Sequence, residues 1–172
     1  FIAQIQWVID QGLQPTHLDS HRHIHIFPAV FGIVCELARR FKIPAVRWGF
    51  EPDYISSPPW PLPAEAGRRK AALLRTMARI NHSQNAGLLK TQALLGIAHG
   101  GKVDVSFFKA VSLYNTAYVS EIITHPACIC DSDKNSVVSS QQQAELSALC
   151  NERTRQCFTD AQIELIHYGQ LD

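Results

Sequence analysis

The sequence contains no long apolar run, and this absence argues against a membrane-spanning segment. None of its 172 residues lies in an uninterrupted apolar stretch of about 18 residues, the length that a spanning helix needs. It also lacks a basic start followed by an apolar segment, so no secretory signal peptide is expected. The net charge is only +1, which leaves neither a basic patch for nucleic acid nor an acidic tail.

Cysteine is sparse and irregularly spaced. The five cysteines are an odd number without the spacing of a disulfide framework, which favours reduced thiols and a cytoplasmic location. Cys128 and Cys130 are separated by one residue, whereas zinc-binding pairs are usually separated by about two to four residues and have a matching second pair. We therefore expect structural cysteines, with a metal site at Cys128 and Cys130 as the less favoured alternative.

Methionine is almost absent as well. The only one is Met77, and the chain opens at Phe1 directly on a helical pattern, which predicts that a further segment precedes it. What is present is ordinary for a globular protein, with 46% hydrophobic and 18% charged residues. A chain of this length forms one domain, so residues 1–172 are expected to be a single unit.

Apolar residues recur at helical spacing in several segments. Helices are expected over residues 1–11, from Pro28 to about residue 42, and over 64–79, 85–98, 105–113 and 139–151. Strands are expected over 15–25, 43–48 and 119–124, and a final helix–strand pair over 159–167. Residues 51–63 contain five prolines and are expected to form a loop.

Strands that alternate with helices favour βαβ units and a parallel sheet. Roughly four units are visible, whereas a closed barrel needs eight strands and about 250 residues. The expected fold class is therefore α/β, a distorted and incomplete (β/α) barrel with parallel strands. An incomplete barrel exposes apolar strand edges, which predicts a homodimer that covers them.

The segment from residue 15 to residue 25 carries most of the chemical information. Its alternate positions hold four imidazoles and one carboxylate: His17, Asp19, His21, His23 and His25. In an extended strand these side chains point to one face. Such a face suits a divalent metal better than a packed core, with some members as ligands and the others as their supports. The alternative is a polar surface strand without a function.

Two further residues follow predicted strands. His125 comes just after the strand over 119–124, and Arg47 lies at the end of the strand over 43–48. In barrels this end of the strands carries the catalytic groups. Arg47 could orient a carboxylate or steady a developing oxyanion, and a structural ion pair is the alternative. For His125 the alternative is an exposed strand end.

Aromatic residues flank the proline-rich loop. They are Trp48, Phe50, Tyr54 and Trp60. Aromatic faces can hold sugar rings, although core packing explains any single one of them better.

The pattern from Pro15 to Pro28, Pro-Thr-His-Leu-Asp-Ser-His-x-His-Ile-His-x-Phe-Pro, resembles the central signature of the YdjC-like carbohydrate deacetylases. Weaker motifs follow in the family's order: Ala-Val-Arg-Trp at 45–48, glycines at 96 and 100, Glu-Ile-Ile-Thr-His-Pro-Ala at 121–127, and the helix around residues 145–149. The resemblance covers nearly the whole chain.

This resemblance implies a distorted α/β barrel that removes N-acetyl groups from an amino sugar or glycoconjugate, with help from a divalent cation, Mg²⁺ or Zn²⁺. It implies that His21 is a metal ligand and that His125 is an acid for the leaving amine. Asp19, His23 and His25 would line the pocket, and Arg47 would orient groups there.

The sequence departs from the family pattern in three ways. The Asp-Asp-Phe-Gly motif and a further histidine ligand, which precede this region in the family, are absent, and Gln142 stands where relatives commonly have Arg. The 172 residues alone would therefore be inactive. Two alternatives remain, an amidohydrolase-like barrel metallohydrolase, which also uses a His-x-His strand, and a non-catalytic sugar-binding protein.

Overall fold

The computed structural model describes residues 1–85, 87–128 and 140–171. Its α-helices are α1 (Ile2–Asp10), α2 (Pro28–Arg40), α3 (Glu65–Asn81), α4 (Val105–Tyr114), α5 (Ser140–Leu149) and α6 (Glu152–Asp160). The strands are short: β1 (His17–Leu18), β2 (Ala45–Val46), β3 (Ala93–Leu95) and β4 (Ser120–Ile122). Short 3-10 helices occur at η1 (His21–Ile26), η2 (Asp53–Ser56), η3 (His82–Asn85) and η4 (Tyr168–Gln170).

The strands pair in parallel, as the sequence predicts. β1 pairs with β2 and β3 pairs with β4, each as a two-stranded sheet. A parallel bridge between Ala45 and Leu89 links the two sheets, and the Leu94 N–H donates to the Phe50 carbonyl at 2.9 Å. The strands therefore follow one another in chain order across a discontinuous parallel layer.

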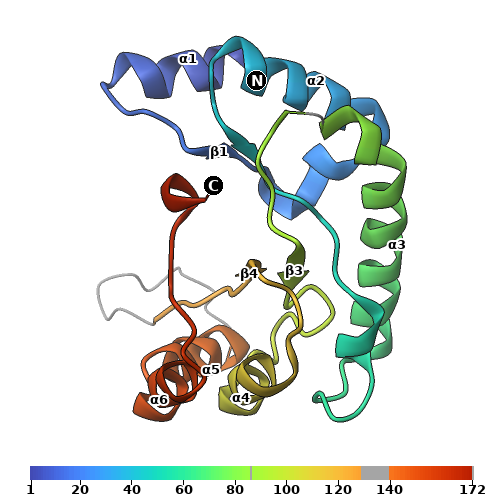
Figure 1. Ribbon diagram of the computed structural model, residues 1–172, viewed down its shortest axis with the longest axis vertical. Helices are drawn as coiled ribbons and strands as arrows, with labels where there is room; N and C mark the ends of the chain where they lie inside the picture. The colour runs from blue at the N-terminus through green and yellow to red at the C-terminus, as the bar shows by residue number, and fades with distance from the viewer. Residues whose placement is uncertain (86, 129–139, 172) are drawn as a thin grey trace.

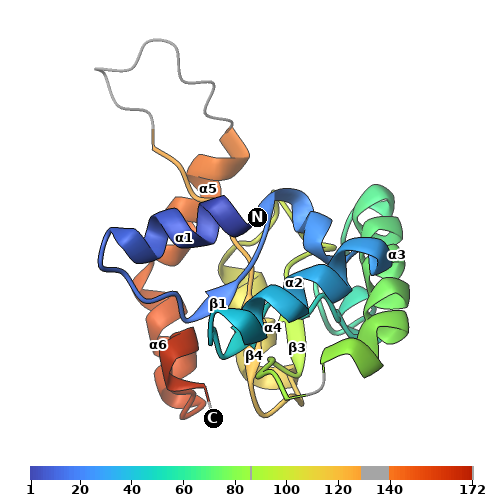
Figure 2. The same cartoon turned by 90° about the horizontal axis from the view of Figure 1, so that it is seen from above.

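Helices surround this layer on its outside. In Figure 1, α1 and α2 lie above the strands, α3 lies beside them and α4, α5 and α6 lie below. Seen from above, α1 and α6 lie on the side opposite α3 (Figure 2). The fold is a mixed α/β arrangement with helices between successive parallel strands.

The core fills the space between strands and helices. One cluster packs α4 and α6 against β3, through Phe107, Phe108, Phe158 and Leu95. A second packs α1 and α2 against β2, and a third joins η1 and α3 to Leu94 of β3, to the residues just after β3 and to Ile123. The buried Trp48 and Trp60 belong to these clusters, so core packing is confirmed for both.

The expected strand over 15–25 is wrong beyond residue 18. β1 ends at Leu18, and the chain then turns into η1, where Arg22 and His23 have left-handed φ values of 55° and 59°. The turn is closed by Ser20, whose hydroxyl accepts the His25 backbone N–H at 2.8 Å. Because an extended strand is absent here, the alternate side chains do not share one face.

Two other expected elements are wrong. Residues 85–98 contain β3 instead of a helix, since Ala93, Leu94 and Leu95 are all buried and such an apolar run fits either structure. Residues 161–167 form no strand, because no described strand pairs with them and Leu165 remains 73% exposed. In α5, Leu149 is 40% exposed, whereas Glu145 is buried.

Glu51 is a buried carboxylate that organises the loop after β3. Its oxygens accept the backbone N–H groups of Gly96, Ile97 and Ala98 at 2.8, 2.9 and 2.9 Å. Gly96 has φ 101°, a conformation that glycine adopts without strain. The Glu51 carboxylate thus accepts hydrogen bonds from three consecutive N–H groups, as the carbonyls of a neighbouring strand would.

Within the described residues, no helix has both the length and the apolar character needed to cross a membrane. The second cysteine of the Cys128 and Cys130 pair lies outside the described residues.

Candidate functional site

The candidate site begins where β1 and β2 end. The register pairs Leu18 with Val46, so Asp19 and Arg47 follow side by side on neighbouring parallel strands. The Arg47 guanidinium donates to an oxygen of Asp19 and, through Nε at 2.8 Å, to Oε1 of Glu121. The sequence left open a structural ion pair for Arg47, and the structure shows that ion pair with two carboxylates.

Glu121 comes from β4 and joins the second sheet to this group. Its Oε1 accepts from two nitrogens of Arg47, and its Oε2 accepts the Tyr168 hydroxyl at 2.6 Å. Burial lowers the pKa of Arg47, but the hydrogen bond and charge of Glu121 and the charge of Asp19 outweigh it, so the pKa is raised. The guanidinium therefore remains charged and anchored.

His25 packs under this ion pair in a defined tautomer. Its Nε2 lies 3.1 Å from the Arg47 carbonyl, which can only accept, so Nε2 carries the hydrogen. Burial lowers the pKa of His25, which keeps the ring neutral, so Nδ1 accepts the Ser20 hydroxyl at 2.7 Å. Asp19 lies 3.5 Å from Nδ1 and would form an ion pair with the ring only after protonation.

His17 is held by an aromatic stack. Its ring lies over that of Tyr168 with centroids 3.9 Å apart and planes inclined by 10°. Burial, followed by the charge of Arg47, lowers the pKa of His17. The structure thus brings His17, Asp19, His25 and Arg47 into one network with Glu121 and Tyr168.

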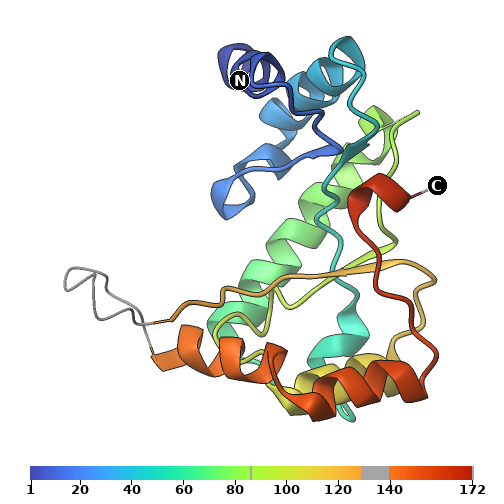
Figure 3. The same ribbon diagram turned by 90° about the vertical axis from the view of Figure 1, so that its left-hand side faces the viewer.

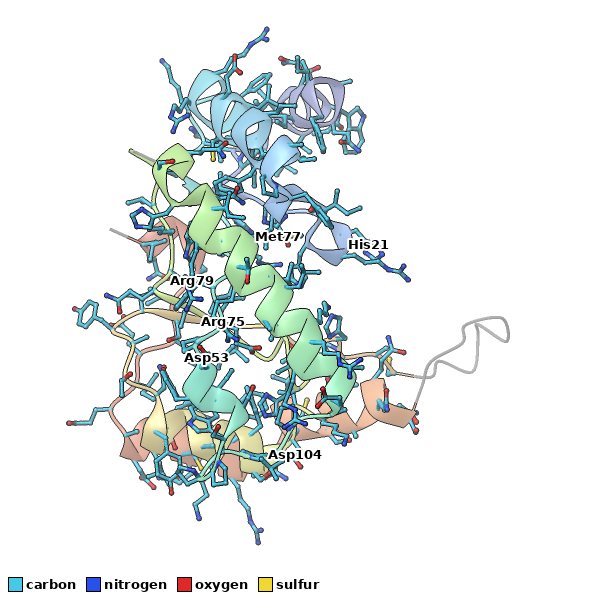
Figure 4. The ribbon with its side chains drawn as sticks, turned by 90° about the vertical axis from the view of Figure 1, so that its right-hand side faces the viewer. His21, Asp53, Arg75, Met77, Arg79 and Asp104 are labelled. Atoms are coloured by element: carbon cyan, nitrogen blue, oxygen red, sulfur yellow. The ribbon has the colours of Figure 1, made fainter. Side chains whose placement is uncertain are left out.

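The remaining candidates stand apart from this network. His21 is exposed at the start of η1, and Figure 4 shows it on a turn that projects beside α3. His23 is buried, its Nδ1 has no hydrogen-bond partner among the described residues, and burial lowers its pKa to about 4. In the described part of the chain, neither side chain contacts Asp19 or Arg47 through a hydrogen bond or ion pair.

His125 lies at the end of the second sheet with its side chain 56% exposed. Its backbone N–H donates to Oε2 of the buried Glu145 at 2.6 Å, and Nδ1 lies 3.9 Å from the same oxygen. The other Glu145 oxygen accepts the Gly101 N–H at 2.8 Å. Glu145 therefore ties the strand end to the loop after β3.

Replacing Glu145 with alanine should release the His125 strand end. Two part-buried backbone donors would lose their acceptor, at a cost of about 1–2 kcal/mol in the free energy of unfolding. Relative to the wild type, this variant should show faster hydrogen exchange at the His125 and Gly101 amides, and little change at the Leu94 amide. Glu152→Ala, at an exposed glutamate, is the control, and equal exchange in both variants would contradict the role assigned to Glu145.

The described residues do not assemble a complete metal site. No group of three His, Cys, Asp or Glu side chains is placed to hold an ion among residues 1–85, 87–128 and 140–171. Asp19 and Glu121, the two carboxylates of the network, are already bound to Arg47. Of the histidines at positions 17, 21, 23 and 25, only His21 is exposed, so the side chains present do not fit a three-ligand site by themselves.

A shallow hollow elsewhere is lined by Trp48 and Phe50, two of the four aromatics that the sequence suggested as sugar platforms. Lys90 Nζ lies 4.5 Å above the Trp48 ring, and Arg79 lies 5.9 Å from the Phe50 ring. Cations already cover these faces, so they are not open platforms. Figure 4 shows Arg79 and Arg75 on α3, with Asp53, the ion-pair partner of Arg75, on the neighbouring η2.

Sequence reasoning missed Glu121 and Tyr168 as members of the network. A carboxylate inside an apolar strand is a signal that could have drawn attention to Glu121, because such a group needs a partner. Nothing near Tyr168 in the sequence predicts that it contacts residues 17 and 121.

Comparison with known proteins gives this arrangement its context. A sequence profile of YdjC-like proteins matches residues 1–160. A carbohydrate deacetylase of Brevibacillus brevis is 28% identical over 171 residues, which is 98% of this chain and 58% of the relative. A chitooligosaccharide deacetylase of Salmonella paratyphi B is 56% identical over 37 residues, 21% of this chain and 15% of the relative. The chain thus spans under three fifths of the length of the Brevibacillus relative.

The fold is also found in a solved structure. A protein described as a cellobiose-phosphate cleavage protein, from Enterococcus faecalis V583, superposes with a TM-score of 0.63 at 19% identity. The match covers 97% of this chain and 57% of that one, and it supports the mixed α/β fold. Because the family profile covers nearly all of the sequence, the chain belongs to the YdjC-like family.

Proposed function

We propose that the protein is a metal-dependent hydrolase that removes N-acetyl groups from an amino sugar or glycoconjugate, on a distorted (β/α) barrel. The observation that carries the proposal is the gathering of Asp19, Arg47 and His25 at the ends of neighbouring parallel strands. In barrels this is the end that carries chemistry. Relatives named as carbohydrate deacetylases over most of this chain's length support the substrate class.

The chain's own residues are assigned separate tasks in this proposal. Arg47 holds Asp19 in place and leaves little freedom to either side chain. The exposed His125 donates a proton to the departing amine, a general-acid role that histidine often takes in enzymes. His21 would hold one coordination position of a Mg²⁺ or Zn²⁺ ion, and such an ion, when bound, would supply Lewis-acid chemistry. A complete metal site needs ligands beyond those that the described residues bring together.

The test is acetate release from N-acetylated chitooligosaccharides by the full-length protein. His125→Gln should lower the rate by at least about 100-fold, because a general acid contributes on that scale. His21→Ala should weaken activation by added Mg²⁺ or Zn²⁺. His82→Ala, at an exposed histidine of η3, is the control and should retain activity. Full activity of His21→Ala and His125→Gln, or no acetate from the wild type, would refute the assignment.

A non-catalytic sugar-binding protein is the second candidate. It is favoured by the commitment of Arg47 to two carboxylates and by the missing three-ligand cluster in the described part of the chain. The same assay separates the two, since a binding protein retains the oligosaccharide without releasing acetate. The family match favours both of these functions over the amidohydrolase alternative.

The homodimer and the cytoplasmic location stay predictions.

A further inference from the structure

The chain returns to the candidate site after α6. Residues 161–167 run without helix or strand from the layer of α5 and α6 back to β1, as Figures 1 and 3 both show. The segment then forms η4, which begins at Tyr168. Gly169 packs closely there, because a Cβ at this position would lie 3.2 Å from Thr16 Cγ2. The last described residues are thus seated on the start of β1.

Tyr168 makes two different contacts at this place. Its ring stacks on His17, with centroids 3.9 Å apart. Its hydroxyl donates to Oε2 of Glu121 at 2.6 Å. Burial, together with the charge of Glu121, raises the pKa of Tyr168, so the phenol remains a neutral donor. One side chain therefore holds an aromatic neighbour from β1 and a carboxylate from β4.

The contact with Glu121 is the first of a series. The other oxygen of Glu121 accepts from Arg47, whose remaining terminal nitrogen donates to Asp19. Asp19 in turn lies 3.5 Å from His25 Nδ1. The Glu121 side chain is 13% exposed and that of Arg47 is 20% exposed, so water has limited access to replace a missing donor.

We propose that Tyr168 is a positioning residue, which fixes the Glu121 carboxylate and through it the Arg47 guanidinium beside Asp19. A carboxylate with donors on both oxygens has one preferred orientation, whereas a carboxylate with donors on one oxygen can turn. When Glu121 turns, Arg47 loses the geometry in which Nε and a terminal nitrogen reach the same oxygen. This positioning role does not depend on the proposed function. Only its effect on catalysis rests on the proposed deacetylase activity.

Tyr168→Phe isolates the hydroxyl, because phenylalanine retains the ring that stacks on His17. We expect the Arg47 Nε–H of the full-length protein, followed by NMR, to exchange with water about tenfold faster in this variant, the loss expected for a hydrogen bond to a charged group. The Leu94 amide, buried in β3, should exchange at the wild-type rate, which separates local loosening from general destabilisation. His17 ring resonances should remain in place.

Tyr168→Leu removes the ring as well. Here the His17 resonances should lose their upfield ring-current shift, in addition to the faster exchange at Arg47. Tyr118→Phe is the matched control, since Tyr118 is 93% exposed, and it should change neither signal. Wild-type exchange at Arg47 in Tyr168→Phe would overturn the proposal, whether or not the protein releases acetate.

The effect of Tyr168 on catalysis is measured separately, by steady-state kinetics. In a protein that releases acetate, Tyr168→Phe should lower kcat with KM nearly unchanged, because reacting groups are misplaced while sugar contacts persist. A changed KM at constant kcat would overturn this part. An inactive wild type would refute the proposed function and leave the NMR result at Arg47 to decide the positioning role.

Discussion

Replacement of Arg47 with alanine should lower the free energy of unfolding by about 3 kcal/mol, because it leaves two partly buried carboxylates without their cation. Asp19 and Glu121 would then repel each other across the junction of the two sheets. Lysine is not an equivalent replacement, since a single ammonium cannot present the donors of a planar guanidinium to two carboxylates. Arg47→Lys should therefore recover only part of the loss.

Urea denaturation followed by circular dichroism measures this effect. Arg68→Ala is the matched control, because Arg68 also pairs with a carboxylate, Glu65, but on an exposed surface with side-chain exposures of 49% and 56%. Water replaces such a partner, so the control should change stability little. An Arg47→Ala midpoint equal to that of Arg68→Ala would show that the network carries no stability.

Replacement of Glu51 with alanine should cost roughly 3 kcal/mol or more, because three buried N–H groups lose their acceptor at about 1 kcal/mol or more each. The loop after β3 should loosen with it. Glu51→Gln preserves the shape and one acceptor oxygen but turns an amide NH₂ toward one of the donors, so its loss should be smaller. Glu164→Ala, at an exposed glutamate, is the control.

Glu51 should also make stability depend on pH. Burial raises its pKa from 4.5 to about 7, more than the three N–H donors lower it. A carboxyl whose pKa is raised on folding binds its proton more tightly in the folded state, so its contribution is largest below about pH 4.5 and declines as the pH rises to about 7. His23, whose pKa falls to about 4, acts in the opposite sense between about pH 4 and 6.5.

Subtracting the unfolding free energy of Glu51→Gln from that of the wild type cancels the contribution of the histidines, which both proteins share. The unfolding free energy of the wild type relative to Glu51→Gln should decrease between pH 5 and about pH 8, measured as urea midpoints at several pH values. A constant or rising difference over this range would contradict the raised pKa.

Much of the architecture was predictable because it depends on local pattern. The helices α1, α2, α3 and α4 were predicted within a few residues, since their apolar spacing and the proline that opens α2 act within a turn or two. The parallel pairing was also predicted, because strands that alternate with helices leave few other connections. Residues 93–95 were assigned wrongly, since a wholly buried run has no periodicity to read.

The candidate site was predictable only in part. The sequence indicated Asp19, Arg47 and the histidines by type and spacing, yet it placed Asp19 and the histidines of residues 17–25 on one strand face. The structure ends that strand at Leu18 and turns the chain at Ser20, so His21 points outward and His25 packs beneath Arg47. A turn closed by a side chain five residues away has no periodic signal.

The sequence by itself determined the family, the positions of α1 to α4, the parallel pairing of strands, and the residue types available for chemistry, because these follow from motifs and local spacing. Only the tertiary structure decided which of those residues meet. Arg47 reaches Glu121 across 74 positions, and Tyr168 reaches Glu121 across 47. These contacts form because an unpaired charge is costly once it is buried, and the spacing of residues along the chain does not show which residues will pair.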